Sequence, residues 1–296
     1  MKKNSVFIGI IALLIALPGT SVASSNKCAT KYPVVLSHGM GAKARIAGIL
    51  DYWGTIPKTL KNNGADVYVT SVNAMDSTAN KAVQWKAQIL QILAVSGKEK
   101  INLIGHSHGT LYSRYAITNL GMASKVASHT SICGPHRGSV IADMIMDNDI
   151  PNSLRNSLGS ALDLVYSFVM GDVNGNSISN VYDLTRDNMI NVFNPNTPNV
   201  NSIYYQSYAF KITNFLGGGL LLPTWKIVIP YEGDNDGLVS VSSAKWGNFR
   251  GVITGIPLFG GISHLGAVGL LSLPTPGYDA PSFFKGVVAD LKKRGY

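Results

Sequence analysis

One five-residue motif, Gly105-His106-Ser107-His108-Gly109, constrains this 296-residue chain more than any other feature. It follows the apolar run Ile101–Ile104 and opens a segment with helical periodicity. A serine in such a sharp strand-to-helix turn has a strained backbone, and side chains two positions away would collide with neighbouring elements, so glycine is required there. The spacing Gly-x-Ser-x-Gly by itself occurs in many unrelated sequences. Its position between a strand and a helix predicts a nucleophile at Ser107, the alternative being an ordinary glycine-rich turn.

A serine hydroxyl is a poor nucleophile unless a base removes its proton. When the nucleophile lies in such a strand-to-helix turn, the order along the chain is nucleophile, acid, histidine. Of the six histidines, this order selects His264 as the base. The alternative is that His264 is a structural histidine. The acid is expected in a loop that follows a strand at Lys226–Ile229. Asp236 is the first choice there and Asp234 the reserve, although Asp-Gly pairs are also common in solvated turns.

A nucleophilic serine also needs two backbone N–H donors for the negative charge that develops on the substrate. The first is expected at His108, directly after the nucleophile. The second is expected in the loop after an early strand, where His38-Gly39-Met40-Gly41 follows Val34–Leu36. Met40 would supply its N–H, while His38 would support the loop.

Short apolar runs alternate with helical patterns, which predicts an α/β fold with a mostly parallel central sheet flanked by helices. The expected strands are 34–36, 67–69, 101–104, 126–132, 203–210 and the run before Asp236; the expected helices are 56–62, 79–95, 108–120 and 283–294. Within 79–95, helical spacing suggests a buried face. That face would consist of Val83, Ala87, Leu90 and Ala94.

The first residues have the pattern of an export signal. Two lysines precede an apolar run at Val6–Leu17, and Ser21-Val22-Ala23 resembles a cleavage site. The run is about a dozen residues, too short to span a bilayer as a helix. We therefore expect a signal peptide at 1–23 and a single domain at 24–296, with localisation outside the cell or in the periplasm.

Residues 141–200 interrupt the alternation of strands and helices. A helix is expected from Pro151, with leucine and valine at helical spacing. We expect this insertion to be a lid that covers the serine in water and opens at a lipid surface, permanent core packing being the alternative.

The net charge limits the partners that this chain can be expected to bind. The formal net charge is +9, and loss of Lys2 and Lys3 with the leader leaves about +7. Basic residues are scattered, with no interleaved aromatic stripe, so no nucleic-acid partner is expected.

The two cysteines, Cys28 and Cys133, could form a disulfide or remain thiols. No C-x-x-C motif is present, so no structural zinc site is expected.

Taken together, these motifs resemble the bacterial true lipases, the triacylglycerol lipases of lipase family I. The resemblance rests on Tyr32–Met40, Ile101–Gly109, Pro135–Ser139, Asp183–Thr185 through Phe193–Asn194, Tyr204–Tyr205 and Asn235–Val239. It implies an α/β-hydrolase fold with a helical lid and a Ser107–Asp236–His264 triad. It also implies an oxyanion hole formed by Met40 and His108.

The sequence departs from the family at the calcium site expected beside the catalytic histidine. A carboxylate ligand should lie two residues after His264, where this chain has Gly266, and the position that helps to close the loop is Leu270. Calcium there is expected to be absent or held differently. A second candidate, the oxygen-rich segment Asp172–Ser177 with Asp183, lacks the expected glycine, and a polar turn is favoured. No cysteine lies near the acid, where some members have a disulfide.

The expected function is that of a secreted carboxylic ester hydrolase. The favoured hypothesis is a triacylglycerol lipase that forms an acyl-enzyme and acts at lipid–water interfaces. A secretion chaperone is a further partner that the resemblance would allow. The alternatives are a non-lipolytic carboxylesterase, a polyester or phospholipid hydrolase with the same triad, and a non-catalytic binding scaffold.

Overall fold

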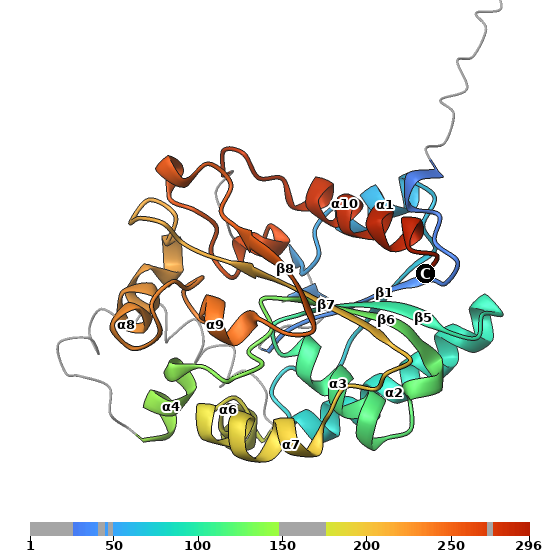
Figure 1. The fold of residues 1–296 in the computed structure, drawn as a ribbon, viewed down its shortest axis with the longest axis horizontal. Coiled ribbons are helices and arrows are strands. Elements are labelled where there is room, and N and C mark those ends of the chain that lie inside the picture. The colour runs from blue at the N-terminus through green and yellow to red at the C-terminus, as the bar shows by residue number, and fades with distance from the viewer. Residues whose placement is uncertain (1–25, 41–44, 47–49, 148–175, 271–274) are drawn as a thin grey trace, which may run out of the picture.

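The computed structural model describes residues 26–40, 45–46, 50–147, 176–270 and 275–296 (Figure 1). The expected signal peptide at 1–23 and the expected lid helix beginning at Pro151 lie outside these residues. The described ends of the insertion are two short helices, α4 (Val140–Met146) and α6 (Ser177–Tyr182).

The described part of the chain is built on a six-stranded sheet with the order β4-β1-β5-β6-β7-β8, and every pairing in it is parallel. Its strands are β1 (Val34–Ser37), β4 (Val67–Thr70), β5 (Ile101–His106), β6 (Val126–Ile132), β7 (Tyr204–Phe210) and β8 (Asn248–Ile253). A separate antiparallel pair is formed by β2 (Arg45–Ile46) and β3 (Leu50–Asp51). The predicted parallel α/β architecture is confirmed.

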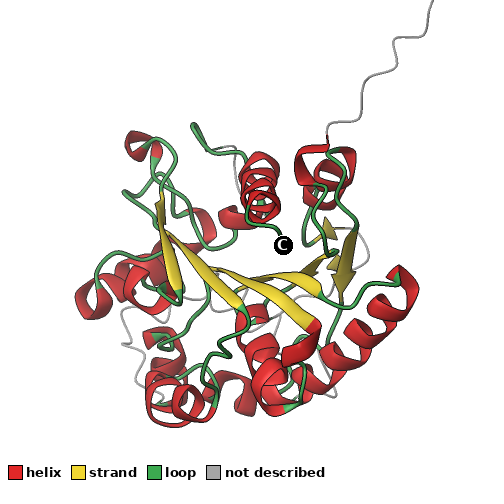
Figure 2. Ribbon diagram, turned by 45° about the vertical axis from the view of Figure 1, so that its right-hand side comes forward, coloured by secondary structure: helices red, strands yellow, loops and turns green. Residues whose placement is uncertain are grey.

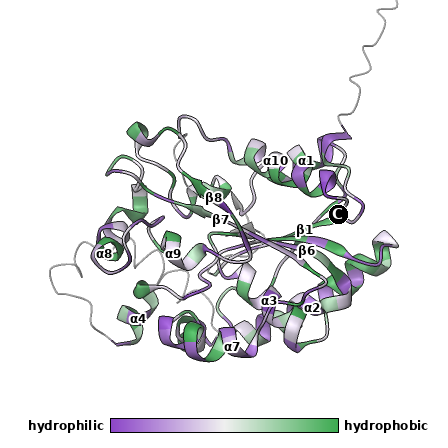
Figure 3. Ribbon diagram, viewed as in Figure 1, coloured by the Kyte–Doolittle hydropathy of each residue, from purple (hydrophilic) through white to green (hydrophobic). Residues whose placement is uncertain are grey.

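Helices cover both faces of this sheet, as Figure 2 shows. On one face α1 (Ile56–Asn62) packs against α10 (Ala280–Lys293), and on the other α2 (Thr78–Ser96) packs against α3 (Gly109–Asn119). The remaining helices are α7 (Asn194–Asn196), α8 (Leu222–Glu232), α9 (Val241–Ala244) and the π-helical η3 (Asn188–Phe193). The 3-10 turns are η1 (Asn26–Cys28), η2 (Ala123–Lys125), η4 (Gly219–Leu221), η5 (Pro257–Phe259) and η6 (Gly266–Val268). The helices carry interspersed hydrophobic and hydrophilic residues, consistent with one side facing a core and the other facing water (Figure 3).

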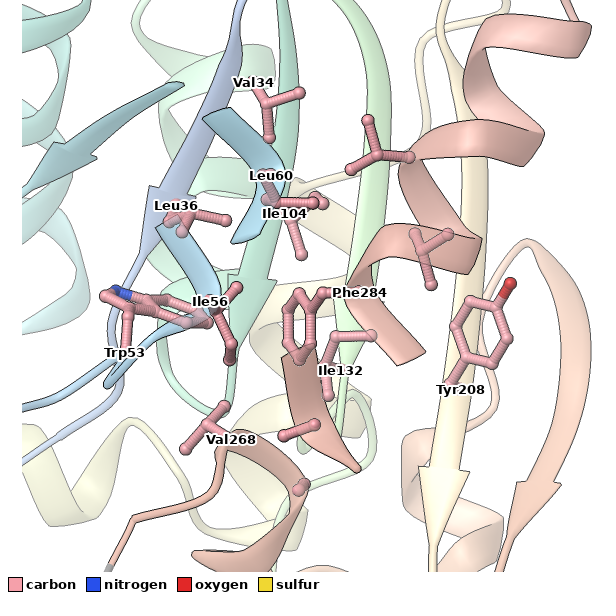
Figure 4. Close-up of a cluster of buried hydrophobic side chains, with 14 of the residues drawn as sticks. Val34, Leu36, Trp53, Ile56, Leu60, Ile104, Ile132, Tyr208, Val268 and Phe284 are labelled. Carbon is pink, nitrogen blue, oxygen red and sulfur yellow. The ribbon is translucent and has the colours of Figure 1, made fainter. Parts of the chain in front are cut away.

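Successive strand residues point to opposite faces, so each face of the sheet has its own core. Under α1 and α10, Leu36 and Ile132 pack in one buried cluster with Phe284 of α10 (Figure 4). Under α2 and α3, Leu103 packs in a second cluster with Trp85. Because the strands are fixed from both sides, the loops at their carboxyl ends start from a rigid base.

The structure corrects the predicted buried face of the long helix α2. Val83 and Leu90 are 57% and 44% exposed, and Ala87 and Ala94 are exposed as well. The buried side carries a different set of residues, namely Thr78, Lys81, Ala82, Trp85, Ile89 and Leu93. The helix has apolar residues on two adjacent faces, and the large Trp85 side chain determines which of them meets the sheet, since it has the most surface to remove from water.

The strand predicted at Lys226–Ile229 is also wrong, because these residues lie in helix α8. Pro223 occupies one of the first two positions of that helix, where its missing N–H costs nothing, and its buried residues Thr224, Ile227 and Val228 recur at helical spacing. The strand next to β7 is instead β8, which the sequence analysis did not predict. Its residues alternate between exposed and half-buried, as on a lightly covered sheet edge.

Both cysteines are buried free thiols, so the possible Cys28–Cys133 disulfide is not formed. They lie in the same apolar cluster as Phe284, and Cys28 donates to the carbonyl of Lys285. Across the described ranges, no helix combines the length and the hydropathy needed to cross a bilayer.

Candidate active site

Ser107 lies in the turn between β5 and α3 with a φ of 55°, in the left-handed region that non-glycine residues rarely adopt. The flanking glycines are required by close packing. A Cβ on Gly109 would lie 2.2 Å from the carbonyl oxygen of Ser37, and one on Gly105 would lie 2.9 Å from the backbone of Gly109. The predicted nucleophile position thus has the strained turn and the tight glycine contacts expected of it.

The structure brings the predicted acid and base together. Nδ1 of His264 lies 2.8 Å from Oδ2 of Asp236, and the His264 amide donates to the Asp236 carbonyl, also at 2.8 Å. The other carboxylate oxygen of Asp236 accepts from the amides of Leu238 and Val239 at 3.0 and 2.8 Å. Both side chains are buried, so the carboxylate orients the imidazole with little competition from water.

The reserve acid has a different role. The Asp234 side chain is 63% exposed and forms an ion pair with Lys211 at 2.7 Å. In the described part of the chain no hydrogen bond joins Ser107 Oγ to the His264 ring. Catalytic hydrogen bonds in empty sites commonly shorten only when substrate is bound.

The loop after β1 passes directly beside the nucleophile. A Cβ on Gly39 would lie 2.8 Å from Cβ of Ser107, so only glycine fits there. His38 supports this loop as predicted, because its Nε2 accepts from the amide of Val72 at 3.1 Å and its Nδ1 therefore donates to the Gly39 carbonyl at 2.9 Å. Burial lowers the pKa of His38 to about 4, which keeps it neutral. The candidate donor Met40 follows directly.

A hydrogen-bonded chain that the sequence analysis missed connects this loop to the base. The Gly39 amide donates to the hydroxyl of Tyr52 at 3.1 Å, and that hydroxyl bonds to Nδ1 of His106. Nε2 of His106 lies 3.1 Å from the carbonyl oxygen of His264 and donates to it, because a carbonyl can only accept. The tyrosine hydroxyl must then donate to Nδ1. Tyr52 belongs to none of the sequence motifs, and only the fold places it here.

Cys133 is a second residue that the sequence did not single out for the site. It directly follows β6 and has a φ of 51°, and with Ser107 it is one of two non-glycine residues with positive φ among those described. Burial, together with the charge of the Asp236 carboxylate, holds the pKa of the Cys133 thiol well above the ordinary value. The thiol is therefore neutral and is not a nucleophile.

Neither candidate metal site has a suitable set of free ligands. Gly266 and Leu270 are buried and carry no side-chain ligand atom, so the loop after His264 lacks the carboxylate that the calcium site of the resembled family requires. Ligand atoms of His106, Cys133 and His264 lie within 4.8 Å of one another, but both ring nitrogens of His106 and Nδ1 of His264 already have protein partners. We derive no chemistry through a metal.

The second calcium candidate lies partly outside the described residues. Its described carboxylate, Asp183, accepts a hydrogen bond from the amide of Thr78 at 2.6 Å. Asp183 thereby links the end of α6 to the start of α2.

An apolar cavity of about 60 Å³ opens beside the nucleophile. Ser107 and Met40 lie at it, and its walls include Ile141, Val181 and Leu184. Aliphatic walls beside a nucleophile suit the hydrocarbon part of a substrate.

The parallel sheet, the strained serine in the turn after β5 and the buried Asp236–His264 pair together define an α/β-hydrolase. The family described as palmitoyl protein thioesterase matches residues 33–187, and the chain belongs to it.

Curated relatives are named triacylglycerol lipases. One from Vibrio cholerae is 45% identical over 116 residues, which make up 39% of this chain and 36% of that protein. One from Burkholderia plantarii is 39% identical over 142 residues, or 47% of this chain and 39% of that protein.

A longer match is to triacylglycerol lipase 2 of Saccharomyces cerevisiae, 33% identical over 213 residues, which cover 69% of this chain and 60% of that protein. The chain spans less than two fifths of the length of the bacterial lipases named above, as the matched shares of 36% and 39% show.

Solved structures share the fold. The mature Bacillus licheniformis lipase BlEst2 superimposes with a TM-score of 0.64 at 19% identity, over 88% of this chain and 92% of that one. The Staphylococcus hyicus lipase gives 0.63 at 18% identity, over 90% and 98%.

Proposed function

We propose that this chain is an exported serine hydrolase of carboxylic esters, with Ser107 as nucleophile, His264 as general base and Asp236 as the acid that orients it. The observation that carries the proposal is the buried Asp236–His264 hydrogen bond, in the same structure as a serine held at φ 55°. Strain at a non-glycine residue persists only where the surroundings enforce it, and it concentrates at functional sites.

The proposed reaction begins when Ser107 Oγ attacks the ester carbonyl while Nε2 of His264 takes the hydroxyl proton. Asp236 fixes the proton on Nδ1, which leaves Nε2 free to accept, and stabilises the imidazolium that forms. The amides of Met40 and His108 bind the oxyanion. Collapse releases the alcohol with a proton from His264, and water activated by the same histidine then hydrolyses the acyl-enzyme.

The proposed substrate is a hydrophobic ester presented at a lipid surface. The cavity beside Ser107 is apolar. Separately, two loops that contact each other carry large exposed side chains. Phe215 is 67% and Leu258 76% exposed, and the side chain of Asn214 holds the loops together by donating to the carbonyl of Leu258 at 3.2 Å. Exposed apolar side chains gathered in this way are typical of interaction sites.

Several related activities would use the same triad. Short soluble esters would make the protein a carboxylesterase, and polyesters or phospholipids would be other bulky substrates. Fatty-acyl thioesters enter as a further candidate because the matching family is described as palmitoyl protein thioesterase. The lipase proposal is preferred because the curated relatives bear that name.

Fluorophosphonate labelling of purified protein tests the nucleophile. Wild type should take up one label, and Ser107→Ala should take up none. Labelling that persists in the variant would overturn the assignment, and an unlabelled wild type would favour a binding scaffold. Hydrolysis of emulsified trioleoylglycerol, a p-nitrophenyl ester series and a palmitoyl-peptide thioester then separates the activities; a flat preference for short chains, with no rise on emulsion, contradicts the lipase proposal.

The surface proposal has its own test in vesicle co-sedimentation of the Ser107→Ala protein, which cannot consume lipid. Phe215→Ser with Leu258→Ser should reduce binding to phosphatidylcholine vesicles about tenfold. The matched control, Val83→Ser with Val95→Ser, removes exposed apolar side chains from α2 and should bind normally. Equal binding by both double variants would show that the two loops do not contact lipid.

A further inference from the structure

Helix α2 carries a lysine with no contact to solvent. Lys81 is 0% exposed, and its ammonium donates to the carbonyl of Ala74 at 2.8 Å and to Nδ1 of His108 at 3.1 Å. Removing an ammonium from water is costly unless hydrogen bonds and opposite charge compensate it. Part of that compensation comes from Asp183, whose pKa is lowered by the charge of Lys81 although burial raises it overall.

The contact with Lys81 settles the state of the His108 ring. An ammonium has only donors, so Nδ1 must accept, and Nε2 therefore carries the proton and donates to the hydroxyl of Thr78 at 2.7 Å. Burial, followed by the charge of Lys81, holds the pKa of His108 well below its ordinary value. The imidazole is thus neutral and held by two residues of one helix.

The backbone of this same residue faces the reaction. His108 follows Ser107 and caps α3, and its amide takes part in no backbone hydrogen bond among the described residues. A helix N-terminus presents such amides together with a partial positive charge. The side chain and the main chain of His108 therefore connect the buried ammonium to the candidate oxyanion hole.

We propose that Lys81 is a positioning residue for the hydrolytic reaction, which acts through His108 to hold the oxyanion amide in place and to put a fixed positive charge behind it. This inference rests on the proposed function. The ammonium lies 3.1 Å from the ring of His108, which places it about 10 Å from an oxyanion on the His108 amide. At an effective dielectric constant of about 20, a unit charge at that distance changes the rate about tenfold.

The test compares Lys81→Met with Lys86→Met. Lys86 lies on the same helix and also donates to a backbone carbonyl, that of Leu120 at 2.9 Å, but it makes no contact with His108. On a soluble p-nitrophenyl ester, Lys81→Met should lose about tenfold in kcat with KM changed less than about twofold. A trifluoromethyl ketone, which binds as a tetrahedral oxyanion, should lose affinity by a similar factor. Lys86→Met should match wild type in all three quantities.

A second variant separates charge from general packing. Thr78→Val keeps Lys81 but removes the partner of Nε2, so it should lower kcat less than Lys81→Met does and leave the melting temperature of the fold within a few degrees of wild type. If Lys81→Met does not fold, an unchanged kcat and inhibitor affinity in Thr78→Val overturns the inference. Wild-type values of kcat and inhibitor affinity in a folded Lys81→Met also overturn it. A wild type that hydrolyses none of the esters overturns the proposed function instead.

Discussion

Replacing Tyr52 with phenylalanine should damage both stability and activity, although it removes a single oxygen atom. The hydroxyl is buried between two polar partners, the Gly39 amide and Nδ1 of His106. Phenylalanine fills nearly the same volume, so the cavity contribution is small. What remains is the loss of both hydrogen bonds.

The magnitude follows from the two buried groups that would lose their partner. Each unsatisfied buried donor or acceptor costs about 1–3 kcal/mol, so the two together should lower the free energy of unfolding by about 2–6 kcal/mol. The activity should fall as well, because Gly39 precedes the candidate oxyanion donor Met40. Loss of a whole oxyanion donor costs about 100-fold or more in kcat, so a loosened one should cost about tenfold.

Urea unfolding followed by circular dichroism measures the first quantity, and ester hydrolysis at saturating substrate measures the second. Tyr278→Phe is the matched control, because its hydroxyl makes one hydrogen bond, to the carbonyl of Ala267 at 2.6 Å, and should cost only about 1 kcal/mol. The reasoning is refuted if Tyr52→Phe unfolds within about 0.5 kcal/mol of wild type, or costs no more than the control.

Three further outcomes follow from the structure. Asp236→Asn should lower kcat about 10⁴-fold with an unchanged circular dichroism spectrum, and a fall below about tenfold would contradict its role. Burial lowers the pKa of His38 to about 4 and of His129 to about 3, while an unfolded histidine titrates near 6.5. At these two histidines only the unfolded chain gains protons below about pH 6.5. Their contribution to stability should therefore be level above that pH and fall by about 1.4 kcal/mol per pH unit per histidine between about pH 6 and 4. Urea midpoints that do not move from about pH 7 to about pH 5 would disprove this. Cys133 should resist iodoacetamide in native protein and react once unfolded, and rapid labelling of the native thiol would contradict its burial.

The nucleophile turn was predictable because its requirements leave a pattern within five consecutive residues. A Cβ on Gly105 would meet the backbone of Gly109 and Thr110 in the turn itself, whereas a Cβ on Gly109 would meet the backbone of Ser37 and His38 at the end of the neighbouring strand β1. The proposed acid and base were chosen from their order along the chain and from their glycine-rich loops. The strand expected before Asp236 is helix α8, so the pairing of Asp236 with His264 does not depend on that strand.

The contacts that support these residues were not predictable, because each depends on segments far apart in the sequence. No sequence pattern around Tyr52 predicts a hydrogen bond to His106, 54 positions later. The buried face of α2 was misjudged for the same reason. In the sequence Lys81 resembles a solvent-facing lysine, and only the fold places a backbone carbonyl and His108 around its ammonium. A shift of one residue in the face of α2 assumed to be buried exchanges the residues predicted to be buried with those predicted to be exposed.

The bond from the His106 ring to the His264 carbonyl closes a loop of 158 residues around the site. Long loops close late in folding, since their entropy is lost before other contacts compensate it. The half of the chain that holds the nucleophile can therefore assemble its strands and helices while the base is still absent. During refolding, the recovery of hydrolytic activity should therefore lag behind the recovery of the helical circular dichroism signal. A chain that is still being synthesised would likewise have no hydrolytic activity until the segment that carries His264 has docked.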